Sequence, residues 1–219
     1  MDETIQNRID DLLRQRHFDT LLAFCAEDRK AWKALQGNLY STNENLIWPA
    51  VEVSAMMMKQ WWNDGEKEKV REYIRRLFWS LNDESGGIGW NAPQTIAQII
   101  ILIPELIDPY GSMMIDRTME EPLLFQNGLW AIGRLGRQIE PSVSFFKEPV
   151  LSKFSNGDPQ TLGMAAWAMG EVAFASALPM LKTLRERQEP VRIYINGSFY
   201  EKPLEQWASD AIAKINSVE

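Results

Sequence analysis

The side chains that most often carry catalysis are scarce in this chain of 219 residues, which has one histidine, His17, and one cysteine, Cys25. A lone cysteine cannot form an internal disulfide, and neither residue has neighbours at the spacing of a zinc site. A glycine-rich phosphate loop and a Ser/His/Asp set are also missing from the sequence. We therefore expect no enzyme activity, no catalytic residues, no metal and no cofactor. His17 fits a helix end or the surface, and Cys25 fits a buried position.

Residues 82–90 are the most unusual segment and a candidate for ligand binding. They combine Asp83, Glu84 and Ser85 with three glycines, ahead of Trp90. Glycine permits backbone conformations closed to other residues, so the segment suits a loop that binds a cation or a partner's basic group. It suits equally a turn between helices in which Asp83 or Ser85 caps a helix. The oxygen spacing of an EF-hand is absent, which excludes that type of calcium loop.

The charge balance argues against two classes of partner. Aspartate and glutamate outnumber lysine and arginine by 30 to 23, which gives a formal net charge of −7 and a pI of about 5.0. Nucleic acids and anionic membranes attract basic surfaces, so we expect neither as a partner. The longest apolar run, residues 96–107, is interrupted by Gln98 and Pro104 and is too short to span a bilayer. Because the sequence starts without a secretory signal, we expect a cytoplasmic protein.

A tryptophan motif repeats along the second half of the chain. Trp130-Ala131-Ile132-Gly133 recurs 37 residues later as Trp167-Ala168-Met169-Gly170, and a weaker copy follows at Trp207-Ala208, 40 residues further on. Periods of this size, on segments with the i, i+3, i+4, i+7 spacing of amphipathic helices, are typical of α-solenoids built from helix pairs. The prediction is an all-α fold, an α-α superhelix of the armadillo or HEAT type, in a single domain over residues 1–219.

Apolar stripes and helix-start signals place the individual helices. Asp158-Pro159 combines an N-cap with proline at the first helical position, and Pro149 and Pro179 predict kinks or late helix starts. We expect a helical lead at 3–26 and about five helix pairs within 30–216. The pairs are 30–40 with 45–62, 67–81 with 91–103, 106–117 with 121–136, 141–155 with 159–173, and 176–188 with 204–216.

One segment inside the last helix pair breaks the helical pattern. Val191, Ile193 and Ile195 alternate with other side chains ahead of Asn196-Gly197. A type I′ turn needs positive φ at both central residues, and Asn-Gly tolerates this best. The sequence therefore predicts a small β-hairpin at 190–200.

The motifs at Trp130 and Trp167, together with the closing hairpin and helix, resemble the HEAT-like repeats of phycobilin lyase subunits. Residues 82–90 resemble a segment, Asp-Glu-Ser-Gly-Gly, of an uncharacterised bacterial and archaeal group of HEAT-repeat proteins. Over residues 30–216 the resemblance implies an armadillo-type superhelix and protein binding. It transfers no catalytic residue, and the arginine that HEAT-like repeats often carry early in the second helix is missing here.

Trp130 and Trp167 lie at matched positions in predicted second helices, which usually line the concave face of such a fold, and Arg134 and Glu171 follow them in phase. One interpretation is an aromatic ladder flanked by charges, suited to a peptide groove. The other is a core between repeats, with Arg134 and Glu171 in salt bridges. The glycines that follow each tryptophan indicate close helix packing, since glycine destabilises a helix interior.

Trp61 and Trp62 are neighbours at the end of a predicted helix, so they cannot both face the same core. We expect one of them to be partly exposed, as part of a partner surface, as a dimer contact or as a cap over the helix end.

The leading hypothesis is a non-enzymatic scaffold that binds a protein or peptide on its concave face. The alternative is a partner subunit of a lyase-like or cofactor-handling enzyme related to bilin lyases. A DNA-repair solenoid is a third interpretation, and the acidic charge argues against it. The residues expected to bind the partner are Asp83, Glu84, Trp90, Trp130, Arg134, Trp167 and Glu171.

Overall fold

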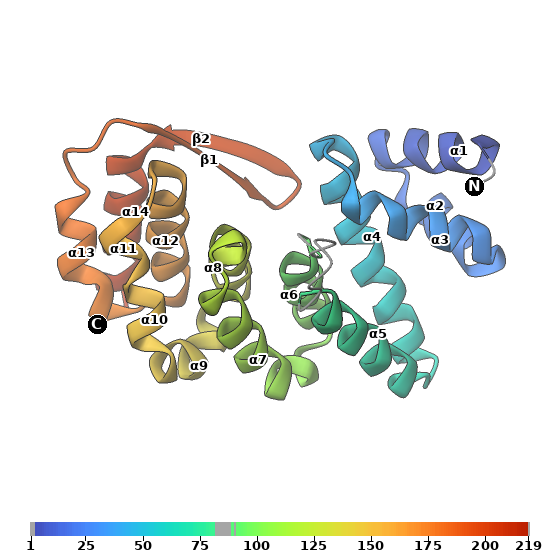
Figure 1. Cartoon of the computed structure of the whole chain (residues 1–219), viewed down its shortest axis with the longest axis horizontal. Coiled ribbons are helices and arrows are strands. Elements are labelled where there is room, and N and C mark those ends of the chain that lie inside the picture. The colour runs from blue at the N-terminus through green and yellow to red at the C-terminus, as the bar shows by residue number, and fades with distance from the viewer. Residues whose placement is uncertain (1–2, 82–88, 90, 219) are drawn as a thin grey trace. The chain divides into compact units, whose positions relative to one another are not determined.

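The computed structural model describes residues 3–81, 89 and 91–218 (Figure 1). It consists of helices and one two-stranded antiparallel sheet, which confirms the predicted fold class. The chain falls into two compact units, Met1–Ile103 (unit 1) and Pro104–Glu219 (unit 2), and each is described by itself. The single-domain organisation over residues 1–219 stays a prediction.

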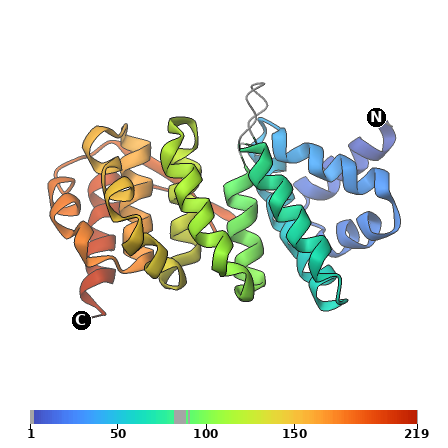
Figure 2. The same cartoon turned by 60° about the horizontal axis from the view of Figure 1, so that its bottom comes forward.

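The described part of unit 1 consists of helices joined by short turns (Figure 2), and α4 packs against α5 and α6. The predicted lead at 3–26 is two helices, because the chain turns at Arg16, whose φ is 55°. The predicted helix pairs lie within a few residues of those observed. The elements are α1 (Glu3–Arg14), α2 (Phe18–Glu27), α3 (Arg29–Gly37), η1 (Asn38–Tyr40), α4 (Glu44–Asn63), α5 (Lys67–Ser80) and α6 (Ala92–Leu102).

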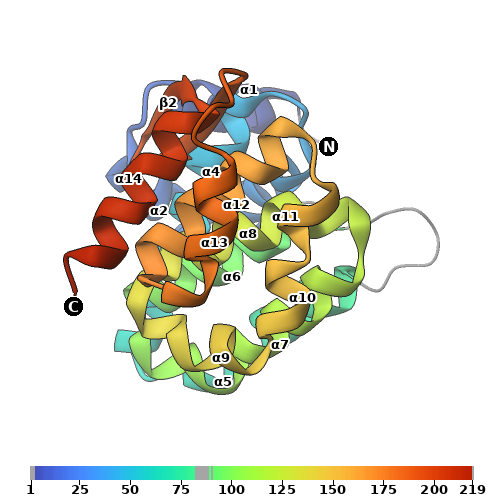
Figure 3. The same ribbon diagram turned by 90° about the vertical axis from the view of Figure 1, so that its left-hand side faces the viewer.

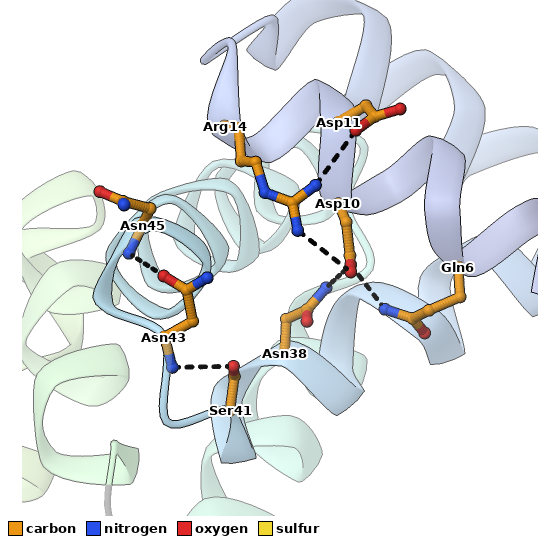
Figure 4. A network of polar contacts seen from close by, with 8 residues as sticks. All are labelled: Gln6, Asp10, Asp11, Arg14, Asn38, Ser41, Asn43 and Asn45. Carbon is orange, nitrogen blue, oxygen red and sulfur yellow. Dashed lines mark hydrogen bonds and ion pairs between the residues drawn. The ribbon is translucent and has the colours of Figure 1, made fainter.

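A polar network attaches α1 to the turn after α3 (Figure 4). Asp10 Oδ1 accepts hydrogen bonds from Gln6 Nε2 at 2.7 Å and from Asn38 Nδ2 at 2.9 Å, and Arg14 lies 3.9 Å from the other Asp10 oxygen. Asn38 is buried. A buried amide is stable only when it is hydrogen-bonded, so the network fixes the register of the lead against the rest of unit 1.

Unit 2 continues the succession of helices, and Asp158 caps α12 as predicted, by accepting the Thr161 N–H at 3.0 Å. The predicted helix at 141–155 is divided into three short helices. The backbone leaves the helical region at Phe146, between the first and the second of them. The helices are η2 (Pro104–Leu106), α7 (Ile107–Glu120), η3 (Pro122–Leu124), α8 (Phe125–Leu135), η4 (Gly136–Ile139), α9 (Glu140–Phe145), α10 (Lys147–Leu151), α11 (Lys153–Asn156), α12 (Pro159–Val172), η5 (Ala175–Ala177), α13 (Leu178–Thr183) and α14 (Leu204–Asn216).

The predicted hairpin is present as β1 (Pro190–Ile195) and β2 (Ser198–Pro203) (Figure 3). The strands are antiparallel, with Ile193 opposite Tyr200. Asn196 and Gly197 have φ values of 49° and 89°, the positive φ that the turn requires. The hairpin extends three residues beyond its predicted end at 200.

The core of unit 2 is centred on α12, which packs on α8 and α14. A Cβ on Gly133 would lie 2.5 Å from the Trp167 ring, and one on Gly170 would lie 2.7 Å from Ala211 Cα. The predicted reason for these two helical glycines, close helix packing, is therefore confirmed.

Across the described ranges, no helix is both long enough and apolar enough to span a bilayer.

Candidate partner-binding site

Three tryptophans on successive second helices define one side of unit 2. Trp130 on α8, Trp167 on α12 and Trp207 on α14 are 3%, 5% and 3% exposed, and the Trp130 and Trp167 ring centroids are 6.4 Å apart. The rings are thus core between the repeats, and an open aromatic ladder is the wrong description of them. Gly133 of α8 lies against the Trp167 ring, and the hairpin lies against Trp130 and Trp207.

The indole N–H groups show what covers the tryptophans. Trp130 Nε1 donates to the Tyr194 carbonyl at 2.7 Å, and Trp207 Nε1 donates to the Val191 carbonyl at 3.1 Å. Both acceptors belong to β1. Trp167 Nε1 donates to Glu171 Oε1 at 2.8 Å. Side chains of α8 and α14 therefore hold an extended strand by its backbone.

Residues of α12 complete this recognition of β1. Gln160 donates through Nε2 to the Arg192 carbonyl at 2.7 Å and accepts the Arg192 N–H through Oε1 at 3.2 Å. This pair of bonds matches the pattern that a neighbouring strand would make. A Cβ on Gly163 would lie 2.3 Å from Val191 Cγ1, so glycine makes room for the strand.

A groove of about 550 Å³ lies between the hairpin, α12 and α14. The edges of Trp167 and Trp207 contribute to its wall, with Tyr200 of β2 and Ala211 of α14. Tyr200 is 47% exposed. Aromatic and apolar surface of this kind, rimmed by charges, is typical of the centres of protein interfaces.

Two ion pairs form the charged rim of the groove. Lys214 Nζ lies 2.5 Å from Glu171 Oε1, and Lys202 Nζ lies 2.8 Å from Asp210 Oδ2. Each pair is partly exposed, and such pairs contribute at most about 1 kcal/mol to stability. Either pair can therefore be broken at little cost in stability.

Comparisons with known proteins place the fold. No family model matches the chain. An uncharacterised protein of Archaeoglobus fulgidus is 29% identical over 161 residues, which are 71% of this chain and 81% of the relative. A computationally designed armadillo repeat protein for modular peptide recognition matches with a TM-score of 0.55 and 18% identity, over 96% of this chain and 92% of the designed one. A second designed armadillo repeat protein gives a TM-score of 0.55 and 17% identity, over 99% and 95%.

The fold is therefore an armadillo-type helical repeat. At these identities the likeness concerns the fold alone. The resemblance to phycobilin lyase subunits and to proteins with an Asp-Glu-Ser-Gly-Gly segment stays a prediction.

The repeat structure places some of the predicted partner-binding residues near the groove. Glu171 lies in its rim, and Arg134 Nη1 donates to Oδ1 of Asn196, another residue of the groove wall, at 2.9 Å. Trp167 contributes an edge, and Trp130 lies beneath β1. Asp83, Glu84 and Trp90 lie outside the described residues. That the seven residues expected from the sequence bind a partner stays a prediction.

The groove residues that were not recognised from the sequence include Tyr200, Lys202, Asp210 and Lys214. The sequence contained a signal for two of them, Tyr200 and Lys202, because the predicted hairpin turn fixes their positions on the strand. The hairpin register puts Tyr200 and Lys202 on the same face as Ile193 and Val191, their cross-strand neighbours. That this face meets α12 and α14 depends on how the hairpin folds back, which no local pattern shows.

Proposed function

We propose that this chain is a non-enzymatic armadillo-type repeat protein that binds an extended segment of a protein or peptide in the groove between the hairpin, α12 and α14. One observation carries the proposal. The second helices already hold an extended strand, β1, through side-chain bonds from Trp130, Gln160 and Trp207 to its backbone. A face that binds extended backbone from its own chain has the chemistry to bind it from another.

The groove offers a partner the side chains that β1 does not cover. Tyr200 offers a large, half-exposed ring, and aromatic anchors of this type often dominate binding energy at interfaces. The Glu171–Lys214 and Lys202–Asp210 pairs each combine one positive and one negative charge, so the rim has no net charge from them. The partner segment accordingly carries an apolar or aromatic side chain for the groove, flanked by residues of either charge.

The fold comparison supports the same class of function. One structural neighbour is an armadillo repeat protein designed for modular peptide recognition. That is a property of the neighbour, and it motivates the choice of a peptide probe here.

The test is a selection of peptides from a displayed random library on the full chain, followed by fluorescence anisotropy titration of the enriched sequences. Tyr200→Ser should weaken binding about tenfold or more, because it removes the aromatic anchor. The double variant Glu171→Gln with Lys214→Met should weaken it by a smaller factor. Tyr40→Ser is the matched control, since Tyr40 is 58% exposed and lies in unit 1.

Equal affinity of the wild type and the Tyr200 variant would remove the groove from the proposal. A library that yields no enriched peptide would remove the proposed function itself.

A further inference from the structure

Unit 1 contains a separate pocket of about 610 Å³ where the ends of several helices meet. Its wall is formed by α3, by the C-terminal end of α4 and by α5, with Cys25 of α2 at its base. The volume is in the usual range for ligand sites, about 300–1000 Å³. The groove in unit 2 shares no residue with it.

Three aromatic side chains from three helices line this pocket: Trp32 of α3, Trp61 of α4 and Tyr73 of α5. The Trp32 and Trp61 rings meet edge to face, with centroids 5.4 Å apart, and the Tyr73 ring is inclined by 50° to Trp32 at 5.9 Å. All three residues are half-buried. Trp61 is thus the partly exposed member of the Trp61-Trp62 pair, whereas Trp62 is 7% exposed.

Internal contacts fix the Tyr73 ring as part of this wall. Its hydroxyl donates to Gln36 Oε1, and burial raises the pKa of Tyr73, so the phenol stays neutral. The polar end of the side chain is therefore bonded within the protein, while its ring lines the pocket.

A cation of the chain itself already lies against this wall. Lys69 Nζ is 3.7 Å from the centroid of the Trp61 ring, and Glu66 Oε2 holds it at 2.5 Å. An ammonium group over an indole face is the geometry of a cation–π interaction. The aromatic wall thus holds a positive charge at the distance that a ligand cation would take.

Acidic and basic side chains line the pocket in equal number, and Glu66 is the carboxylate paired with Lys69. Asp64, Glu66 and Glu72 line the pocket with Arg29, Lys69 and Arg76. Glu72 is paired with Arg76. When a ligand cation takes the place of Lys69, the Glu66 carboxylate remains beside it.

We propose that this pocket binds a methylated or quaternary ammonium group, which displaces Lys69 from the Trp61 ring. The ligand must compete with a primary ammonium that is tethered in place. A primary ammonium is strongly hydrated, whereas methyl groups weaken hydration and add apolar contact with the rings. Recognition of quaternary ammonium by aromatic side chains follows from these two effects. The site is independent of the peptide groove proposed for unit 2.

The test is a calorimetric titration of the full chain with choline at constant ionic strength. The neutral carbon isostere, 3,3-dimethyl-1-butanol, is the matched ligand control. Lys69→Met should tighten choline binding about 3- to 10-fold by removing the competing cation. Lys33→Met is its control, because Lys33 is an exposed lysine of α3 outside the pocket.

Trp61→Leu should weaken choline binding about tenfold, whereas Trp79→Leu should leave it unchanged, since Trp79 is 78% exposed and does not line the pocket. If the Trp61 variant unfolds, the Lys69 variant still decides the question. Equal binding of choline and its neutral isostere, an unchanged affinity in Lys69→Met, or no choline binding to either protein would overturn the proposal. None of these outcomes affects the peptide test on unit 2.

Discussion

Three tryptophans of unit 2 and two of unit 1 have opposite surroundings. In unit 2, Trp130, Trp167 and Trp207 are at most 5% exposed, and their N–H groups are bonded to β1 or to Glu171. In unit 1, Trp32 and Trp61 are half-buried at a pocket and have charged neighbours. The same residue type therefore builds a core in one unit and a candidate ligand wall in the other.

The difference follows from what faces each ring. Gly133 lets α8 approach closely enough to cover the Trp167 ring of α12. At Trp61 the helix is about to end at Asn63, and the next helix presents Lys69 to the ring face. Whether a tryptophan belongs to the core or to a binding site therefore depends on the group that contacts its ring.

Cys25 probes the wall of the unit 1 pocket and has the largest expected effect. Burial, with a smaller contribution from Asp28, raises the pKa of its thiol from 9.0 to about 12. At pH 8 the thiolate fraction, and with it the alkylation rate, should be about 1000-fold below that of an unperturbed thiol. Iodoacetamide labelling followed by mass spectrometry measures this, with the urea-unfolded chain as control.

The same pKa shift predicts a loss of stability at alkaline pH. Below about pH 9 the thiol is neutral in both the folded and the unfolded chain, so the free energy of unfolding does not depend on it. Between about pH 9 and 12 only the unfolded chain loses this proton, so the free energy of unfolding falls as the pH rises. Cys25→Ala should flatten the decline in unfolding free energy over this interval. Labelling of folded Cys25 at the rate of the unfolded chain would show that the wall is open to water.

Gly170→Ala tests how closely the helices of unit 2 pack. The new Cβ would lie 2.7 Å from Ala211 Cα, so α12 and α14 must separate, at a cost of about 1–3 kcal/mol. Urea unfolding monitored by circular dichroism gives the value. The matched control is Gly37→Ala at the end of α3, where nothing lies within 4 Å of the added Cβ, and it should be neutral or stabilising. Equal effects of the two variants would contradict the packing account.

Conservative substitution of one tryptophan in each unit tests the contrast itself. Trp130→Phe leaves the Tyr194 carbonyl without its indole donor and should cost about 1–3 kcal/mol of unfolding free energy. Trp61→Phe replaces a half-buried indole with a smaller aromatic ring, and should cost less than about 1 kcal/mol of unfolding free energy. Urea unfolding measures both. A reversed order would mean that the unit 1 ring is the structural one.

Gln160→Leu should have a small effect on stability, about 1 kcal/mol, because it removes two bonds to the Arg192 backbone. Its effect is local, so hydrogen exchange across residues 190–203 is the sensitive measurement. Exchange should be faster there and unchanged in unit 1. Gln138→Leu, an exposed glutamine in the same unit, is the control. Unchanged exchange at 190–203 would show that Gln160 does not hold the strand.

Much of the fold could be predicted from local signals. The Asp158-Pro159 start, the Asn196-Gly197 turn and the apolar stripes each act within a few residues, so the sequence alone specifies them. Within 141–155 a kink or late helix start was expected at Pro149, and α10 begins two residues before it. The bend at Phe146 itself was not predicted, because it lies inside an otherwise helical apolar pattern. The break in the lead at Arg16 was missed for a different reason, since a positive φ at arginine has no local sequence signature.

The candidate sites were less predictable, because they depend on contacts between distant residues. Trp130 and Trp167 lie on second helices as expected, but what covers them comes from elsewhere in the chain. Trp130 is bonded to a hairpin more than 60 residues away, and Gly133 of α8 lies against the Trp167 ring. One of Trp61 and Trp62 was expected to be partly exposed, and it is Trp61. Its neighbours Trp32 and Tyr73 come from other helices, and helix packing alone brings them together.

The most direct test of the central claim is hydrogen exchange of the full chain with and without a peptide selected from the library. Binding in the groove predicts slower exchange in β2 and in α14, with residues 58–76 of unit 1 unaffected. Protection confined to unit 1, or no protection in β2 and α14 at saturating peptide, would contradict the claim that the groove of unit 2 receives an extended polypeptide.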